Sequence, residues 1–246
     1  MTRIYSDLCK EDTKFWLEIL ANKHIEPGKY REAMTKIGMH LGNAILTQID
    51  DEQADVYLAC TVEDADFLAK GMLLSLEKHL SKIAFACFWN QRFSPFEIED
   101  LKVAPILKKY QEPTNKKIKY LVIVKSIISG ACVVRTNIVN TIQKIEPEKI
   151  FIVAPVIYQN AEQKLKDEFE KSIYDKFQFF YFAKDDERTP DGEVIPGIGG
   201  NVYLRLGFEG QNHKNEYIPE IVKLRRSQFV YRAKASDASE ATPNAT

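Results

Sequence analysis

The residues best suited to chemistry lie in segment 125–132, which reads Lys-Ser-Ile-Ile-Ser-Gly-Ala-Cys. It joins an apolar run, Tyr120–Val124, to a stretch with helical periodicity. A loop of small residues at such a junction lets backbone N–H groups approach an anion, and the positive end of the following helix adds to the attraction. The segment therefore predicts a phosphate site, with an ordinary tight turn between strand and helix as the alternative.

A second segment, 189–200, reads Thr-Pro-Asp-Gly-Glu-Val-Ile-Pro-Gly-Ile-Gly-Gly. Its prolines fix φ and its glycines permit close backbone approach, which suits a flat ligand read by main-chain groups. A surface connection rich in turn-forming residues has the same composition. Just before it, Asp185 and Asp186 end an apolar run, where paired carboxylates could hold magnesium, orient a hydroxyl or simply face solvent.

Two basic clusters could bind phosphate-rich partners or form solvated faces. The first cluster comprises Lys108, Lys109, Lys116, Lys117 and Lys119. The second comprises Lys223, Arg225, Arg226, Arg232 and Lys234. Phe229 and Tyr231 are interleaved with the second, which makes it the better candidate for nucleic-acid contact. None of the four histidines stands at a suggestive spacing from Ser or Cys, so no catalytic role is predicted for them.

Composition restricts the possible functions. The 246 residues hold 34 Lys and Arg against 35 Asp and Glu, a balance that argues against a protein whose main task is to wrap nucleic acid. The 45% of hydrophobic residues can bury a sizeable core. No apolar run approaches the ~20 residues of a membrane span. Small-molecule chemistry or protein contact is therefore favoured.

The cysteines and the N-terminus predict a cytoplasmic protein. Cys9, Cys60, Cys87 and Cys132 are widely separated, and no C-x-x-C pair or nearby His suggests zinc. We expect reduced, buried thiols in a reducing compartment. The polar N-terminal residues do not resemble a secretory signal.

Short apolar runs alternate with helical patterns through residues 54–182. Expected strands are 56–60, 83–88, 120–124 continuing to 128, 150–156 and 177–182. Expected helices follow the apolar stripes of residues 65–80, 134–142 and 161–173. Strands that are apolar on both faces and separated by helices indicate an α/β fold, with a parallel sheet flanked by helices.

The flanking regions complete the expected organisation. Residues 1–50 form an N-terminal helical region, with a long amphipathic helix over residues 30–45. Residues 51–232 form the main domain, including a more polar hood at about 89–119. The polar tail, 233–246, has nothing to bury and is expected to be disordered.

In this order, the segments resemble the uracil phosphoribosyltransferases, members of the type I phosphoribosyltransferase family. The family's ribose-phosphate motif, approximately V-D-P-M-L-A-T-G-G-S, is similar to segment 124–133. Its diphosphate loop is similar to segment 58–72, and its base-recognition stretch to segment 186–207. The matching residues of the base stretch are Gly192, Val194, Pro196, Gly197 and Gly199. The resemblance covers about residues 23–210 and includes the hood.

The resemblance implies a fold, a site and a reaction. The 5′-phosphate would lie on Ser129, Gly130, Ala131, Cys132 and Val133. The nucleobase would lie on Val194, Ile195, Pro196, Gly197, Ile198 and Gly199. An active enzyme would transfer ribose 5-phosphate from phosphoribosyl diphosphate, as in pyrimidine salvage, and would need magnesium. The resemblance also implies a homodimer, for which the N-terminal helices offer apolar surface.

Several positions depart from the family's pattern. The acid of the ribose-phosphate motif is Lys125 here, followed by Ser126. The Arg of the diphosphate loop falls near Glu63 and Asp64. The acid after the P-G-x-G motif is replaced by Gly200, and Arg205 approximates a family Arg with an offset of one residue.

The reciprocal change of charge suggests that Glu63 or Asp64 pairs with Lys125 across adjacent strand ends. Such a pair would occupy space that a diphosphate and its metal need, and two carboxylates would repel the diphosphate. Two functions follow. The first is a phosphoribosyltransferase-like protein that binds a nucleobase or nucleotide and transfers ribose phosphate. The second is a non-catalytic nucleotide-binding, regulatory or scaffold module that acts with a protein partner. An accessory protein for nucleic acid is a third hypothesis, and no membrane partner is expected.

Overall fold

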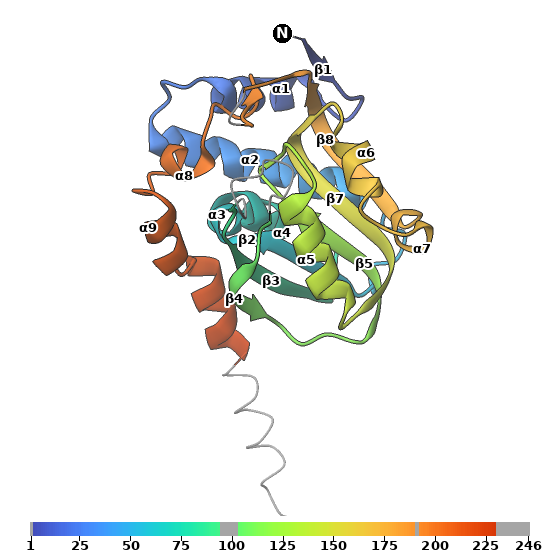
Figure 1. The fold of residues 1–246 in the computed structure, drawn as a ribbon. Coiled ribbons are helices and arrows are strands. Elements are labelled where there is room, and N and C mark those ends of the chain that lie inside the picture. Colours follow the sequence, from blue (N-terminus) through green and yellow to red (C-terminus); the bar gives the residue numbers. More distant parts are fainter. Residues whose placement is uncertain (1, 94–102, 190–191, 230–246) are drawn as a thin grey trace, which may run out of the picture.

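The computed structural model describes residues 2–93, 103–189 and 192–229, and the central feature is a mixed sheet (Figure 1). Its strands follow the order β1-β8-β7-β5-β2-β3-β4, with β6 paired to β7. Their bounds are β1 (Arg3–Tyr5), β2 (Val56–Thr61), β3 (Ile83–Asn90), β4 (Ile106–Gln111), β5 (Lys117–Val124), β6 (Ile127–Ile128), β7 (Glu146–Tyr158) and β8 (Phe177–Asp185). The five central strands are parallel, and β1 and β4 pair antiparallel at the edges.

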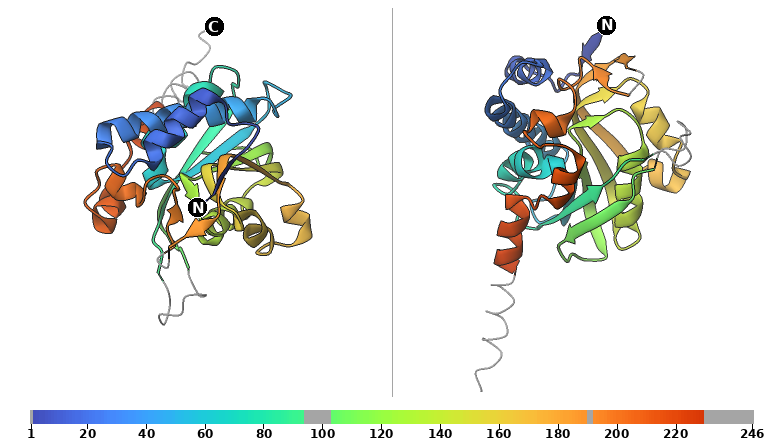
Figure 2. Two further views of the ribbon diagram at one scale, coloured as in Figure 1. Left: turned by 90° about the horizontal axis from the view of Figure 1, so that it is seen from above. Right: turned by 60° about the vertical axis from the view of Figure 1, so that its left-hand side comes forward.

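Helices cover both faces of this sheet, as Figure 2 shows. One face carries α1 (Glu11–Ala21), α2 (Pro27–Leu46) and α4 (Lys70–Leu76), whose apolar residues form one core layer with the sheet. The other carries α5 (Cys132–Ile142), α6 (Ala161–Lys166) and α7 (Lys171–Tyr174) over a second core layer. The predicted α/β fold is confirmed, and the N-terminal helices belong to the first layer.

The strand order creates a switch point between β2 and β5. From β2 the chain moves to β3 on one side, then crosses back to β5 and continues outward through β7 and β8. The connections from β2 and β5 therefore leave in opposite directions, which opens a crevice at the carboxyl ends of these two strands. Ligands of open α/β sheets bind in such crevices.

Helix α2 packs closely enough on the segment after β2 to leave no room for side chains at the contact. That segment runs through α3 (Val62–Asp64) and a π-helical turn (Ala65–Ala69) into α4. A Cβ atom on Gly38 would lie 2.2 Å from the Leu68 carbonyl oxygen, and one on Gly71 would lie 2.2 Å from the Thr35 carbonyl oxygen. The two glycines thus set the position of the chain that carries Glu63 and Asp64.

Several expected elements differ in extent. The strand expected to continue from 120 to 128 breaks at Lys125 and Ser126, whose side chains turn into the crevice, and resumes as β6. The helix expected over 161–173 divides into α6 and α7. Both edge strands, β1 and β4, were missed. Strand β9 (Glu187–Arg188) pairs antiparallel with β10 (Val194–Ile195), and β10 lies within the stretch expected to be a loop.

The C-terminal part adds α8 (Val202–Arg205), α9 (Gln211–Glu216) and a helix over residues 220–229. Ile221 and Val222 of this last helix join the first core layer. The tail predicted for 233–246, and part of the hood, lie outside the described residues. Within the described ranges, no helix combines the length and the apolar character that crossing a bilayer requires.

Candidate functional site

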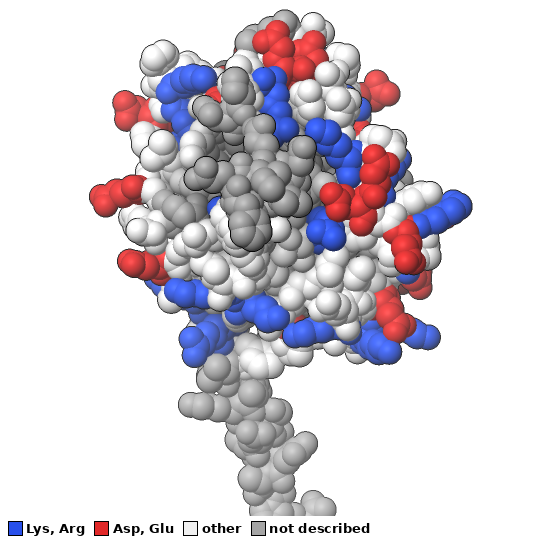
Figure 3. Space-filling view, viewed as in Figure 1, with Lys and Arg blue, Asp and Glu red and all other residues white. Residues whose placement is uncertain are grey.

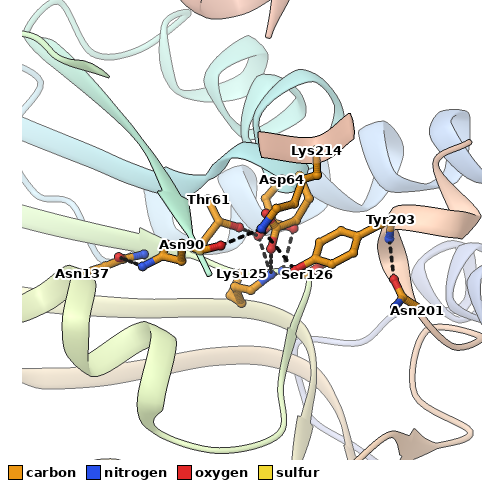
Figure 4. A network of polar contacts seen from close by, with 10 residues as sticks. Thr61, Asp64, Asn90, Lys125, Ser126, Asn137, Asn201, Tyr203 and Lys214 are labelled. Carbon is orange, nitrogen blue, oxygen red and sulfur yellow. Dashed lines mark hydrogen bonds and ion pairs between the residues drawn. The ribbon is translucent and has the colours of Figure 1, made fainter. Parts of the chain in front are cut away.

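A buried ion-pair cluster lies at the switch point. The Nζ atom of Lys125 is 2.8 Å from Asp64 Oδ2 and 3.1 Å from Glu63 Oε1. The side chains of Lys125, Glu63 and Asp64 are 6%, 5% and 0% exposed, respectively. The predicted pairing across the two strand ends is confirmed, and both carboxylates take part. Figure 4 shows Asp64 beside Lys125. Protein atoms therefore fill the part of the crevice between β2 and β5.

Both strands fix the orientation of Asp64. The hydroxyl of Thr61, the last residue of β2, donates to Asp64 Oδ2 at 2.6 Å. The backbone N–H of Ser126 donates to Asp64 Oδ1 at 3.1 Å. The Lys125 ammonium also donates to Ser126 Oγ at 3.3 Å. The cluster is thus built from main-chain and side-chain donors on both sides of the switch point.

The electrostatics of the cluster favour a charged lysine. Burial acts to lower the pKa of Lys125, but the carboxylates of Asp64 and Glu63 outweigh it, and this pKa is raised. Burial acts to raise the pKa of Glu63, but Lys125 and Lys214 bring it below its ordinary value. For Asp64, burial and the nearby Glu63 prevail over Lys125, and the pKa is raised. The two carboxylates that contact this ammonium therefore have pKa values shifted in opposite directions.

A second buried lysine, Lys214 of α9, extends the cluster. It is 1% exposed, and its ammonium donates to the Asn90 carbonyl oxygen at 2.6 Å. The ammonium also lies 4.8 Å from the centre of the Tyr203 ring. The Asn90 side chain donates to Asn137 Oδ1 at 3.0 Å, which links this end of β3 to α5 (Figure 4). Sequence reasoning missed Lys214 because the polar run 211–216 carries no apolar periodicity.

The predicted phosphate loop lines a separate, open pocket. Residues Ser129, Gly130, Ala131 and Cys132 line a pocket of about 870 Å³, and Val133 follows in the first turn of α5. Cationic side chains on the pocket wall come from Arg92, Arg135, Lys164 and Arg188, with Asp167 and Glu168 among them. Arg135 pairs with Glu168 at 3.0 Å. The wall thus holds more cations than carboxylates.

Ser129 is the residue of this loop best placed to meet an anion. It is 8% exposed and lines the pocket, yet its hydroxyl makes no hydrogen bond with another described residue. A hydroxyl in this situation has a donor available for a ligand. Together with the positive end of α5, it gives the pocket wall two features that attract phosphate.

The predicted base stretch borders β6, but residues 194–199 do not line the pocket at loop 129–133, and part of their main chain is already paired. A Cβ on Gly197 would lie 3.2 Å from Ile127 Cδ1, so the stretch borders β6, which leads to Ser129. The Gly197 N–H donates to Asp185 Oδ2 at 2.8 Å, and the Ile198 carbonyl accepts from Tyr30 Oη at 3.0 Å. Val194 and Ile198 are each 1% exposed. Ile195 and Pro196 are half-buried, and Gly199 is buried.

Asp185 is paired inside the protein and is not a solvated strand end. It is 0% exposed, and both of its carboxylate oxygens accept from the Arg3 guanidinium, at 2.8 and 2.7 Å. Asp186 accepts from the Thr2 backbone N–H, and this hydrogen bond lowers the pKa of Asp186. Sequence reasoning missed Arg3 because β1 is too short to show a pattern.

The remaining candidate positions, Arg205 and Gly200, lie against other groups of the protein. Arg205 donates to the carbonyl oxygens of Lys23 and Asn22, at 2.6 and 2.7 Å, and stacks on the Tyr30 ring. Gly200 has φ +106° and faces Glu193. In the part of the chain that the structure describes, no group of three or more His, Cys, Asp or Glu side chains could hold a metal ion.

Two side chains in the described part of the second basic cluster form ion pairs. Arg225 forms a two-bond contact with Glu112, at 2.7 and 2.9 Å, and Lys223 pairs with Glu220. Arg232 and Lys234 lie outside the described residues. In the first cluster, Lys116 pairs with Glu146 and Lys119 with Asp50. Figure 3 shows cationic side chains along the lower edge of one face, with anionic ones interspersed at the right.

The four thiols are expected to differ in reactivity. Cys9, Cys60 and Cys87 are buried, whereas Cys132 is half-buried and lines the phosphate pocket. Burial raises the pKa of Cys132, while Arg92 and Arg135 act in the opposite direction. In the folded protein we expect a maleimide to label Cys132 first, because reaction requires access. Peptide mapping by mass spectrometry checks this, and faster labelling of Cys60 or Cys87 would contradict it.

Comparisons with known proteins bear on the fold. The sequence matches no protein-family model and no curated protein. The structure is similar to the AQ2163 protein of Aquifex aeolicus, with a TM-score of 0.66 and 16% identity over 84% of this chain and 99% of that chain. At this identity the likeness concerns the fold alone.

Phosphoribosyltransferases are also among the structural neighbours, at low identity. A hypoxanthine phosphoribosyltransferase from Staphylococcus aureus has a TM-score of 0.40 and 16% identity, over 64% of this chain and 76% of that chain. A hypoxanthine-guanine phosphoribosyltransferase from L. donovani has a TM-score of 0.35 and 12% identity, over 63% of this chain and 78% of that chain.

Proposed function

We propose that this protein binds a nucleotide through the phosphate loop 129–133 and does not transfer ribose phosphate from phosphoribosyl diphosphate. The observation that carries the proposal is the combination of an open phosphate pocket with a crevice that Lys125, Glu63 and Asp64 fill. The first feature keeps a site for a monophosphate. The second removes the space beside it in which a diphosphate leaving group would develop its charge.

The phosphate end of the ligand is supported by three local features. These are the Ser129 hydroxyl, which pairs with none of the described residues, the start of α5 at Cys132 and the cationic wall of the pocket. A volume of about 870 Å³ lies within the range of small-molecule sites. The base would lie toward 194–199, which borders β6, and a pyrimidine is the base that the sequence resemblance favours.

The argument against transfer is electrostatic. Stabilising a diphosphate leaving group requires cations or donors aimed at the developing negative charge. Glu63 and Asp64, which follow β2, carry negative charge and would repel the diphosphate. The cation that neutralises them, Lys125, is already shared between the two. These carboxylates are not suited to hold magnesium either, because the ammonium occupies the position between them.

Titration calorimetry separates the two functions. We expect a nucleoside 5′-monophosphate to bind, phosphoribosyl diphosphate to bind at least about tenfold more weakly, and EDTA to change neither result. Uridine, adenosine and guanosine monophosphates test the base. Tight binding of phosphoribosyl diphosphate with magnesium, followed by release of diphosphate in the presence of uracil, would establish an active transferase instead.

Protection of Cys132 provides an independent check on the location. A nucleotide seated on loop 129–133 would cover the thiol, so its alkylation should slow by about tenfold at ten times the dissociation constant. Inorganic phosphate should protect less, because it lacks the base and sugar. Nucleotide binding without protection of Cys132 would place the ligand elsewhere on the molecule.

A further inference from the structure

The N-terminal strand is joined to the base stretch by one arginine. The Arg3 guanidinium donates to Asp185 Oδ1 and Oδ2, and its Nη2 also donates to the Gly197 carbonyl oxygen at 2.6 Å. Asp185 in turn accepts from the Gly197 N–H at 2.8 Å. Both main-chain groups of Gly197 are therefore held by the Arg3–Asp185 pair, whose side chains are 10% and 0% exposed.

The shape of the stretch depends on these bonds because its local backbone is demanding. Gly197 has φ +55° and Gly199 has φ +78°, in the region that favours glycine. A Cβ on Gly197 would lie 2.3 Å from the Val194 carbonyl oxygen, so the chain turns tightly. Glycine also loses the most conformational freedom on folding, so a glycine-rich turn needs external contacts to stay in one shape.

We propose that Arg3 is a positioning residue that shapes the 194–199 stretch and so sets the affinity for the base part of the ligand. This inference rests on the proposed function and names the element that completes its site. The phosphate loop lies on the chain between β5 and α5, and no hydrogen bond between described residues joins it to Arg3. Arg3 should therefore act on the base and leave the phosphate unaffected.

The test compares two ligands on two variants and the wild-type protein. Calorimetry would measure a nucleoside 5′-monophosphate and ribose 5-phosphate, which lacks the base, on the Arg3→Gln, Arg3→Lys and wild-type proteins. We expect Arg3→Gln to weaken the nucleotide by about tenfold and ribose 5-phosphate by less than twofold. Arg3→Lys keeps the charge but loses the two-bond geometry, so we expect little rescue.

Arg225→Gln is the matched control. Arg225 also makes a two-bond contact with a carboxylate, Glu112, and donates to a main-chain carbonyl, that of Ile83, at 2.8 Å. It lies where β3 begins, at the opposite end of that strand from the crevice. A general loss of stability would appear in both variants. A change in the ratio of nucleotide to ribose 5-phosphate affinity should appear only in Arg3→Gln.

Hydrogen exchange on the ligand-free protein gives a second readout. We expect Arg3→Gln to speed exchange of the amides in 194–200 and to leave those of α5 unchanged. If the wild-type protein binds no nucleotide, the proposed function fails, while the exchange result still decides whether Arg3 holds the stretch. Unchanged exchange in 194–200, or equal weakening of both ligands, would overturn the inference.

Discussion

Replacing Lys125 with methionine is expected to lower the free energy of unfolding by about 3–5 kcal/mol. Methionine has a similar length but no charge, so the variant leaves Glu63 and Asp64 buried without their shared cation. Removing one partner of a buried ion pair is costly because the remaining charge can neither reach water nor find a counter-charge. Denaturant unfolding followed by circular dichroism measures the effect.

A triple variant tests the origin of this loss. Combining Lys125→Met with Glu63→Gln and Asp64→Asn removes the unpaired charges, and we expect it to recover at least half of the lost stability.

Because the pKa of Lys125 is raised, its stabilisation of the fold is present below the ordinary lysine pKa of 10.5 and is lost as the pH rises beyond that value. If Lys125→Met alone lowered the free energy of unfolding by less than about 1 kcal/mol, the cluster would be surrounded by water rather than by protein.

Replacing Gly38 with alanine is expected to destabilise the protein by about 3 kcal/mol. The new Cβ would lie 2.2 Å from the Leu68 carbonyl oxygen and 3.1 Å from Gly71 Cα, so α2 must move away from the chain that leads into α4. Main-chain atoms cannot rotate out of the way as a side chain can. Denaturant unfolding measures the loss.

Gly28→Ala provides the control on the same helix. Gly28 lies near the start of α2, and a Cβ there would meet nothing within 4 Å. Alanine has the higher helix propensity, so this change should stabilise the protein by about 0.5 kcal/mol. Equal loss of stability in both variants would show that α2 does not tolerate alanine in general, and it would refute the close-contact explanation for Gly38.

The layered fold could be predicted from the sequence because its signals are local. The five parallel strands are apolar on both faces, and the stripes of α2, α4 and α5 recur with helical spacing. The break after Val124 could not be predicted, because Ile127 and Ile128 continue the apolar run and only the crevice favours the turn at Lys125. The edge strands β1 and β4 lack an apolar pattern, since each has one open side.

The candidate site was only partly predictable for a related reason. The pairing of Lys125 with Glu63 or Asp64 followed from a reciprocal difference in charge from a resembled family. Lys214 and Arg3 had no such reference, and each reaches its partners across more than 120 residues of sequence. Long-range polar contacts of this kind depend on the final packing of helices and edge strands. A linear pattern does not encode that packing.

The charge cluster at the switch point also constrains how this sequence can change. A substitution that removes the charge of Lys125 alone leaves two buried carboxylates without their shared cation, and it costs several times more than a typical surface change. Lys125 should therefore change among relatives only together with the two carboxylates. Sequences in which Lys125 has changed alone should be less stable than those in which Glu63 and Asp64 have changed with it.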